Sequence, residues 1–308
     1  MRQNSGRIEW FTGLAAIIVA TVIWGYSNVV IRQGEAAVSP SILLWTRFGL
    51  ASVVLIPAII KTRLIRRHWV LGLATGALLG LSVLAQAFAM KSVPVDEVAF
   101  VGSLYVVFTP IGIAILRKRF PSKAVFAAVF VSVAGVSLLT GRITLNLRVG
   151  LIFVFLAAIG LSAQIIGTTE IAKHATALQI AGLQSVGATI VLSVYVLAQG
   201  AVHPSIYDGM FRWSTTEWIW ILYMAIPATV VACYLQAFGQ TRIRATEAAL
   251  AFNIEPIWTA VFAWGLLSQT MNIAQMVGAV LILASLFLVS KLGEDIPAPP
   301  ERASSFGS

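Results

Sequence analysis

The stretch QAFAMKSVPVDEVAFVGSLYVVFTPIGIAIL, residues 86–116, returns 150 positions later as QAFGQTRIRATEAALAFNIEPIWTAVFAWGL, residues 236–266. The two copies align without a gap, but their basic residues lie at opposite ends. The first copy has Lys91 in the turn near its start and is followed by Arg117-Lys118-Arg119, whereas the second has Arg242 and Arg244 in that turn and is followed by the uncharged Leu267-Ser268-Gln269. In membrane proteins Lys and Arg mark the cytoplasmic end of a segment, so this exchange is expected of a repeat that occurs in both orientations.

The composition excludes a soluble protein of this length. The chain has 308 residues, of which 58% are hydrophobic and 11% charged, and its mean hydropathy is +0.89. The net charge of +9 is scattered over short loops, which indicates membrane topology rather than nucleic-acid binding. The single cysteine, Cys233, lies in an apolar run, so no intrachain disulfide is expected, and we expect neither a metal nor a cofactor.

Apolar runs long enough to cross a hydrocarbon layer of about 30 Å as helices occur ten times. We predict these spans at 12–31, 41–60, 69–90, 95–116, 122–140, 149–169, 176–199, 217–240, 245–267 and 272–290. The sequence therefore predicts an all-α membrane protein with two five-helix units, 12–140 and 149–290. Because five is odd, the second unit is inverted relative to the first. Residues 291–308 are expected to form a disordered cytoplasmic tail.

The distribution of Lys and Arg over the loops predicts the orientation. With ten spans, fifteen of these residues fall on the side of the amino terminus and five on the other, and Arg47 lies within a span. By the positive-inside rule both termini are cytoplasmic, in a plasma membrane such as the bacterial inner membrane. Inverted units of this kind are typical of transporters that expose a central site to either side in turn.

Two ionisable side chains, Arg47 and Glu255, lie within predicted spans. A charge at this depth costs about 2.5–3.5 kcal/mol on insertion scales, so each needs protein or water around it. Arg47 either binds the carboxylate of a substrate or extends outward to the membrane surface. Glu255 either binds a proton or a substrate amine, or makes a hydrogen bond to a neighbouring helix. Pairing between the two stays open at this point.

Uncharged residues in the spans supply further candidates. Those proposed to line a substrate site with Arg47 and Glu255 are Trp24, Tyr26, Asn28, Trp45, Gln86, Tyr105, Gln164, Gln236, Asn253 and Trp258. The alternative for the amides is hydrogen bonding between helices, and for the rings it is packing. Pro110 and Pro256 are expected to bend their helices, for gating or simply for packing. The glycines Gly72, Gly76 and Gly80, spaced by four, predict close approach of another helix.

The sequence lacks the residue patterns that the common enzyme classes require. The histidines, His68, His174 and His203, lie at span ends or in loops, and the sequence has no HExxH motif, no phosphate loop and no soluble domain for ATP. We therefore expect neither an enzyme nor a pump with an ATP-binding subunit. A channel stays open as a different class, although no filter loop or ring of charges is evident.

A family resemblance rests on three short stretches: WGYSN at Trp24–Asn28, WTRF at Trp45–Phe48, and the turn from Ala87 to Val95. Together with the proline-bearing fourth and ninth spans, these resemble the ten-span EamA-type branch of the drug/metabolite transporter superfamily. Within it the chain is most similar to aromatic amino acid exporters of the YddG type.

This resemblance implies alternating access through a central cavity and export of aromatic and other neutral amino acids, with aromatic cations such as viologens as further substrates. The partners expected are small-molecule substrates and the lipid bilayer, without nucleic acid, and a monomer is favoured. Alternatives on the same fold are a multidrug or quaternary-cation carrier and a carrier of another small metabolite. The residues permit both proton coupling and facilitated diffusion.

Overall fold

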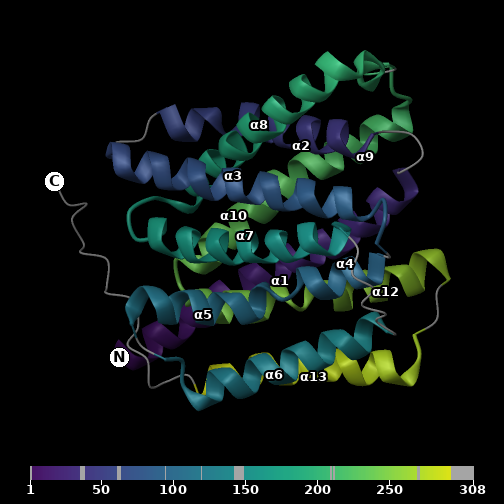
Figure 1. The fold of residues 1–308 in the computed structure, drawn as a ribbon. Coiled ribbons are helices and arrows are strands. Elements are labelled where there is room, and N and C mark those ends of the chain that lie inside the picture. Colours follow the sequence, from purple (N-terminus) through teal and green to yellow (C-terminus); the bar gives the residue numbers. More distant parts are fainter. Residues whose placement is uncertain are drawn as a thin grey trace.

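The structure is a computed structural model and describes residues 2–34, 39–60, 64–93, 95–118, 120–141, 149–208, 210, 212–268 and 271–292. Within these ranges the chain is helical and contains no strand. The helices form a bundle in which α1 begins at the end where α13 finishes (Figure 1). Most of the predicted tail, residues 293–308, lies outside the described residues.

The helices follow the predicted spans closely. The first half contains α1 (Arg2–Gly34), α2 (Pro40–Ile60), α3 (Arg66–Ala89), α4 (Val95–Gly102), α5 (Tyr105–Arg117) and α6 (Lys123–Thr140). The second half contains α7 (Val149–Ile171), α8 (Ala177–Val202), η1 (Pro204–Tyr207), α9 (Thr215–Ala225), η2 (Ile226–Val231), α10 (Ala232–Gln240), α11 (Ala245–Phe252), α12 (Glu255–Leu267) and α13 (Ile273–Leu292).

Of the described residues, nine segments are long and apolar enough to cross a membrane, and α13 adds a shorter apolar stretch, Ile273–Leu288. The prediction differs most at α1, which begins at Arg2 rather than near residue 12. Hydropathy marks where a helix enters the apolar layer, not where it starts, and no proline interrupts the polar residues before that point.

The fourth and ninth spans are each built from two short helices. The breaks fall at Ser103-Leu104 and at Asn253-Ile254, again 150 positions apart. The helices α5 and α12 also end alike, on left-handed residues Lys118 (φ 51°) and Ser268 (φ 53°). Pro256 lies in the first turn of α12, whereas Pro110 lies inside α5. The first copy has Val106 where the second has Pro256, yet both copies break at the same position. The break therefore does not require this proline.

The two halves of the chain are interleaved. Helix α6 lies along α13, α3 lies along α7 and α8, and α2 lies along α8 (Figure 1). Helix α1 packs against α10 and α12. Each half therefore buries much of its apolar surface on the other half. The outer surface exposes large apolar side chains such as Ile115, Phe130 and Val194, as expected where lipid covers a protein.

The glycine stripe of α3 is a helix-packing surface. A Cβ at Gly76 would come within 2.2 Å of the Gln184 carbonyl oxygen of α8, and one at Gly72 within 2.6 Å of Leu183 Cδ1. At Gly80 it would lie 2.9 Å from Ala188 Cα. The predicted close approach is confirmed, and it joins α3 of the first half to α8 of the second.

Candidate functional site

The carboxyl group of Glu255 lies beside two polar residues. The break at Asn253-Ile254 places Glu255 in the first turn of α12, facing α1. Asn28 Nδ2 donates to Glu255 Oε1 at 3.1 Å and to Thr259 Oγ1 at 3.0 Å. The helices meet closely because Gly25 has no side chain: a Cβ there would lie 2.6 Å from Trp258 Cβ. Glu255 is half-buried and Asn28 is exposed.

The guanidinium of Arg47 points into the protein rather than outward to the membrane surface. Arg47 as a whole residue is only 9% exposed. Nε donates to Thr229 Oγ1 at 2.9 Å and Nη2 to the carbonyl of Ala228 at 3.3 Å, both in the turn η2. The remaining group, Nη1, has no acceptor in the described part of the chain. Arg47 is thus held at one edge by neutral groups, its guanidinium carbon lies 5.0 Å from the centroid of the Phe48 ring, and no carboxylate of the described residues pairs with its charge.

Arg47 and Glu255 interact electrostatically but do not touch. Each charge acts on the other. Between described residues, however, the one ion pair with a separation of 4.0 Å or less joins Lys173 and Glu170. The pairing that the sequence left open is therefore not a direct salt bridge. Two opposite charges in the interior, each with hydrogen-bonding capacity left, have the chemistry to accept a carboxylate and an ammonium group respectively.

Aromatic side chains lie next to these charges. The Trp24 indole Nε1 also donates to the carbonyl of Ala228, at 2.9 Å, and its ring meets Phe252 at a centroid distance of 5.8 Å. The ring of Tyr26 stands edge-on to those of Tyr223 and Phe262, at 5.0 and 5.4 Å.

Two more predicted aromatic residues belong to this region. The Tyr105 phenol is within electrostatic reach of Glu255. On α12, Trp258 has a buried indole N–H that meets no acceptor within the described ranges.

Other predicted site residues point elsewhere. Asn253 is fully buried and donates to Ser132 Oγ of α6 at 2.9 Å. Trp45 Nε1 donates to Ser193 Oγ of α8 at 2.9 Å. The amide of Gln86 lies against Gly102 of α4, 3.5 Å from where a Cβ would be.

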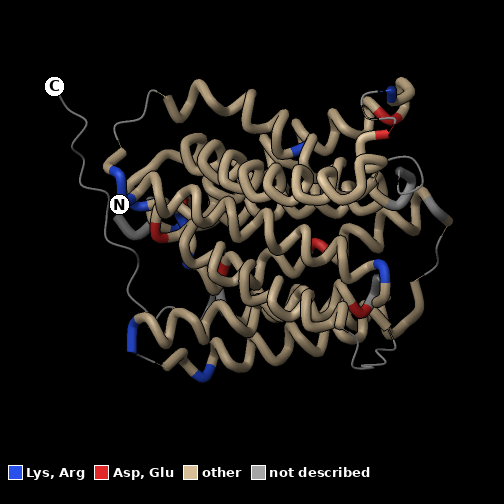
Figure 2. The backbone as a smooth tube through the Cα atoms, turned by 45° about the horizontal axis from the view of Figure 1, so that its top comes forward, with Lys and Arg blue, Asp and Glu red and all other residues tan. Residues whose placement is uncertain are grey.

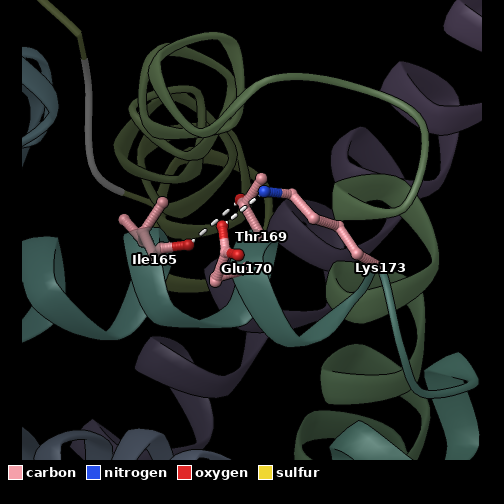
Figure 3. Close-up of polar contacts among 4 residues, drawn as sticks. All are labelled: Ile165, Thr169, Glu170 and Lys173. Carbon is pink, nitrogen blue, oxygen red and sulfur yellow. Dashed lines mark hydrogen bonds and ion pairs between the residues drawn. The ribbon is translucent and has the colours of Figure 1, made fainter. Parts of the chain in front are cut away.

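Gln164 and Gln236 belong to a buried network that joins α7 and α10, and Gln184 of α8 enters it by donating to Thr168 Oγ1, as Gln164 also does. Gln236 Nε2 donates to Gln164 Oε1 and to Gln240 Oε1, each at 3.3 Å. Gln240 Nε2 continues to the Ile165 carbonyl at 2.9 Å and to Thr169 Oγ1 at 3.1 Å. Figure 3 shows these two acceptors near the end of α7, beside the Glu170–Lys173 ion pair. For these two glutamines the structure therefore supports the alternative given above, hydrogen bonding between helices.

Sequence reasoning missed Thr229, Thr259 and the carbonyl of Ala228. Threonine is common in membrane helices and a backbone carbonyl has no sequence signature. The one available signal was Pro227, which removes a backbone donor in the middle of the eighth span.

An open cavity of about 350 Å³ lies away from the charged pair. It is lined by residues at the start of α8 and at the end of α10, among them Thr176, Leu178, Tyr234, Phe238 and Arg242. Neither Arg47 nor Glu255 contributes to it, so we base the candidate site on the charges and their contacts.

Comparison with known proteins gives consistent matches. The sequence pattern described as the EamA-like transporter family matches residues 11–141 and again 148–291. Two proteins of Archaeoglobus fulgidus, each named "Uncharacterized transporter", are 26% and 24% identical over 280 and 289 residues. These alignments cover 91% and 89% of this chain, and 86% and 96% of those proteins.

A solved structure, titled "Crystal structure of protein", has the same fold. It superposes with a TM-score of 0.74 at 17% identity, over 93% of this chain and 99% of the other. At that identity the likeness concerns the fold alone.

Proposed function

Because the chain belongs to the EamA-like transporter family and is a multi-pass membrane transporter, we propose that it exports aromatic and other neutral amino acids. Transport proceeds by alternating access through a central cavity between inverted units, in a plasma membrane such as the bacterial inner membrane. One observation carries the choice of substrate: Arg47 and Glu255 are interior residues of opposite charge, each hydrogen-bonded to neutral groups, and within the described ranges they form no ion pair with each other.

The proposed architecture consists of units 12–140 and 149–290, inverted, with both termini cytoplasmic. Its first support is the recurrence of α4 and α5 as α11 and α12, with the same break. Its second is charge: Figure 2 shows Lys and Arg concentrated at the end of the bundle where the termini are marked. From the helix bounds, that end holds Arg7, Arg66, Arg67, Arg117, Lys118, Lys123, Lys173, Arg242 and Arg244. The positive-inside rule assigns it to the cytoplasm.

A zwitterionic α-amino acid suits the two charges. Its carboxylate binds Arg47 Nη1, for which the described residues supply no acceptor, and its ammonium binds Glu255. Asn28 holds one oxygen of Glu255 and leaves the other for the ligand. A charge-assisted bond at each end would offset the removal of both ligand charges from water. A ligand with only one charge leaves one protein charge without a partner.

The rings favour an aromatic or other apolar side chain. Trp24 shares the Ala228 carbonyl with Arg47, Tyr105 is within electrostatic reach of Glu255, and Tyr26 packs against Tyr223, so an apolar substituent that covers these rings gains hydrophobic stabilisation. Trp258 adds a buried indole donor on α12.

Counterflow in proteoliposomes tests this function. Purified protein in liposomes loaded with unlabelled tryptophan should accumulate labelled tryptophan, and phenylalanine should compete. Two analogues probe the charges: tryptamine lacks the carboxylate and indole-3-propionate lacks the amine. Each should compete at least about tenfold less well than tryptophan, since each forfeits one charge-assisted hydrogen bond. Arg47→Met should remove the advantage of tryptophan over tryptamine, and Glu255→Gln its advantage over indole-3-propionate.

The result also separates the alternatives. If folded protein shows no tryptophan counterflow, the amino acid proposal is wrong. Tryptamine that competes better than tryptophan would favour the second candidate, a carrier of aromatic cations, which the half-buried Glu255 beside aromatic rings would also serve. Uptake without any counterflow would indicate a channel.

A further inference from the structure

The eighth span contains one wide helical turn, η2, between α9 and α10. The N–H of Ala232 bonds to the carbonyl of Pro227, five residues earlier, which is π-helical spacing. Thr229 Oγ1 donates to the carbonyl of Met224 at 2.8 Å, again five residues earlier. The side chains of Ala228 and Thr229 are fully buried. Turns of this kind are rare and frequently occur at functional sites.

Two side chains from the first half of the chain donate hydrogen bonds to this turn. The carbonyl of Ala228 accepts both Trp24 Nε1, at 2.9 Å, and Arg47 Nη2, at 3.3 Å. A carbonyl oxygen has two lone pairs and can serve both donors. Thr229 Oγ1 accepts Arg47 Nε at 2.9 Å. The turn thus joins α1 and α2 of the first half to the eighth span of the second.

The hydroxyl of Thr229 has a fixed direction. It has one proton, which it gives to the carbonyl of Met224, so its lone pairs are left for Arg47 Nε. Both acceptors of Arg47 on this turn are neutral and leave its charge uncompensated. They occupy the Nε and Nη2 edge of the guanidinium, while Nη1 has no acceptor among the described residues.

We propose that the turn η2 positions Arg47 for recognition of the substrate carboxylate, with Thr229 as the positioning residue. The inference rests on the proposed function, in which Arg47 binds that carboxylate. Arginine has a long side chain whose ordering costs rotamer entropy, and two bonds at one edge of its planar group fix the direction in which the other edge faces. Neither Thr229 nor Ala228 needs to touch the substrate.

The test compares substrates with and without a carboxylate. Thr229→Val keeps the branched shape but removes the acceptor, Thr229→Ser keeps the acceptor, and Thr229→Ala is a second loss variant. Thr189→Val is the matched control, because the Thr189 hydroxyl bonds to Ser52 Oγ and the Ser185 carbonyl, at a contact between α2 and α8, and not to Arg47 or the turn η2. For each protein in liposomes, we would measure the half-saturating concentration of tryptophan and the concentration of tryptamine that halves tryptophan uptake.

Thr229→Val should raise the half-saturating tryptophan concentration about tenfold and change tryptamine inhibition less than about twofold, because only the carboxylate contact is misaligned. Thr229→Ser should return tryptophan to within about threefold of the unsubstituted protein, since the hydroxyl is restored. Thr189→Val should behave as the unsubstituted protein.

Different failures have different meanings. If Thr229→Val and Thr229→Ala weaken the binding of tryptophan and of tryptamine equally, Thr229 is only structural. If neither variant changes the binding of either compound, Thr229 has no role. Both results overturn the inference while amino acid transport stands. If Arg47→Met leaves the half-saturating tryptophan concentration unchanged, Arg47 does not bind the carboxylate and the inference is wrong. Absence of tryptophan transport by the folded, unsubstituted protein refutes the proposed function and this inference with it.

Discussion

Gly76 of α3 lies against the backbone of Gln184 of α8, so closely that a Cβ at residue 76 would be 2.2 Å from the Gln184 carbonyl oxygen. Neither backbone can yield without moving a helix. This contact joins the two halves of the chain along the surface that α3 forms with α7 and α8.

Gly76→Ala should therefore separate α3 from α8 and lower stability by about 1–3 kcal/mol, the usual cost of overpacking a close contact. Thermal unfolding in detergent, followed by size-exclusion chromatography, measures the change in Tm. Gly49→Ala is the matched control, because a Cβ at Gly49 of α2 meets no atom within 4 Å. Equal Tm values for the two variants would contradict the packing account.

Asn28 is expected to matter more than its hydrogen-bond partner Thr259. Asn28 Nδ2 donates to both Glu255 and Thr259, so Asn28→Leu removes two bonds, one of them to a carboxylate. We expect tryptophan uptake to fall about tenfold in Asn28→Leu and less than about threefold in Thr259→Val, because bonds to charged groups are worth more. Initial rates at low tryptophan concentration give the comparison, and full activity of Asn28→Leu would remove this residue from the site.

Asn253 is predicted to support the fold rather than the substrate. Its amide donates to Ser132 Oγ of α6 in a fully buried position. Asn253→Ala should lower Tm through loss of this bond, worth about 0.6 kcal/mol on average between membrane helices, yet leave the half-saturating tryptophan concentration within about twofold. Ser132→Ala, which removes the same bond from the other side, should match it. A large change in tryptophan affinity with unchanged Tm would return Asn253 to the substrate site.

Orientation in the membrane can be measured with single cysteines. Cys233 is buried and is the sole cysteine of the sequence, so Cys233→Ser provides a background without thiols. In intact cells a membrane-impermeant thiol reagent should label Lys91→Cys, between α3 and α4, and should label Lys118→Cys, after α5, only once the cells are opened. The opposite pattern would place the termini outside and invert the proposed direction of transport.

The membrane class, the approximate spans and the two interior charges follow from the sequence by itself. Apolar length and the cost of inserting a charge are local properties of a segment, so they need no knowledge of neighbours. The recurrence of Gln86–Leu116 as Gln236–Leu266 is likewise visible in the sequence, but the matched breaks at Ser103-Leu104 and Asn253-Ile254 were not predicted: the sequence indicated bends at Pro110 and Pro256, which do not occupy equivalent positions in the two copies. The spacing of Gly72, Gly76 and Gly80 is also a local property, and it predicted the close helix contact that α3 makes.

Only the tertiary structure decided which polar groups meet. Arg47 and Thr229 are 182 positions apart, and Asn28 and Glu255 are 227 apart. Most of the spans are apolar all round, so periodicity does not state which face of a helix meets which neighbour. Asn253 and Glu255 are close in sequence, yet Asn253 bonds to α6 while Glu255 bonds to α1. The helix break between them gives the two residues different directions, and the close approach of α1 at Gly25, a contact between the two halves of the chain, brings Asn28 to Glu255.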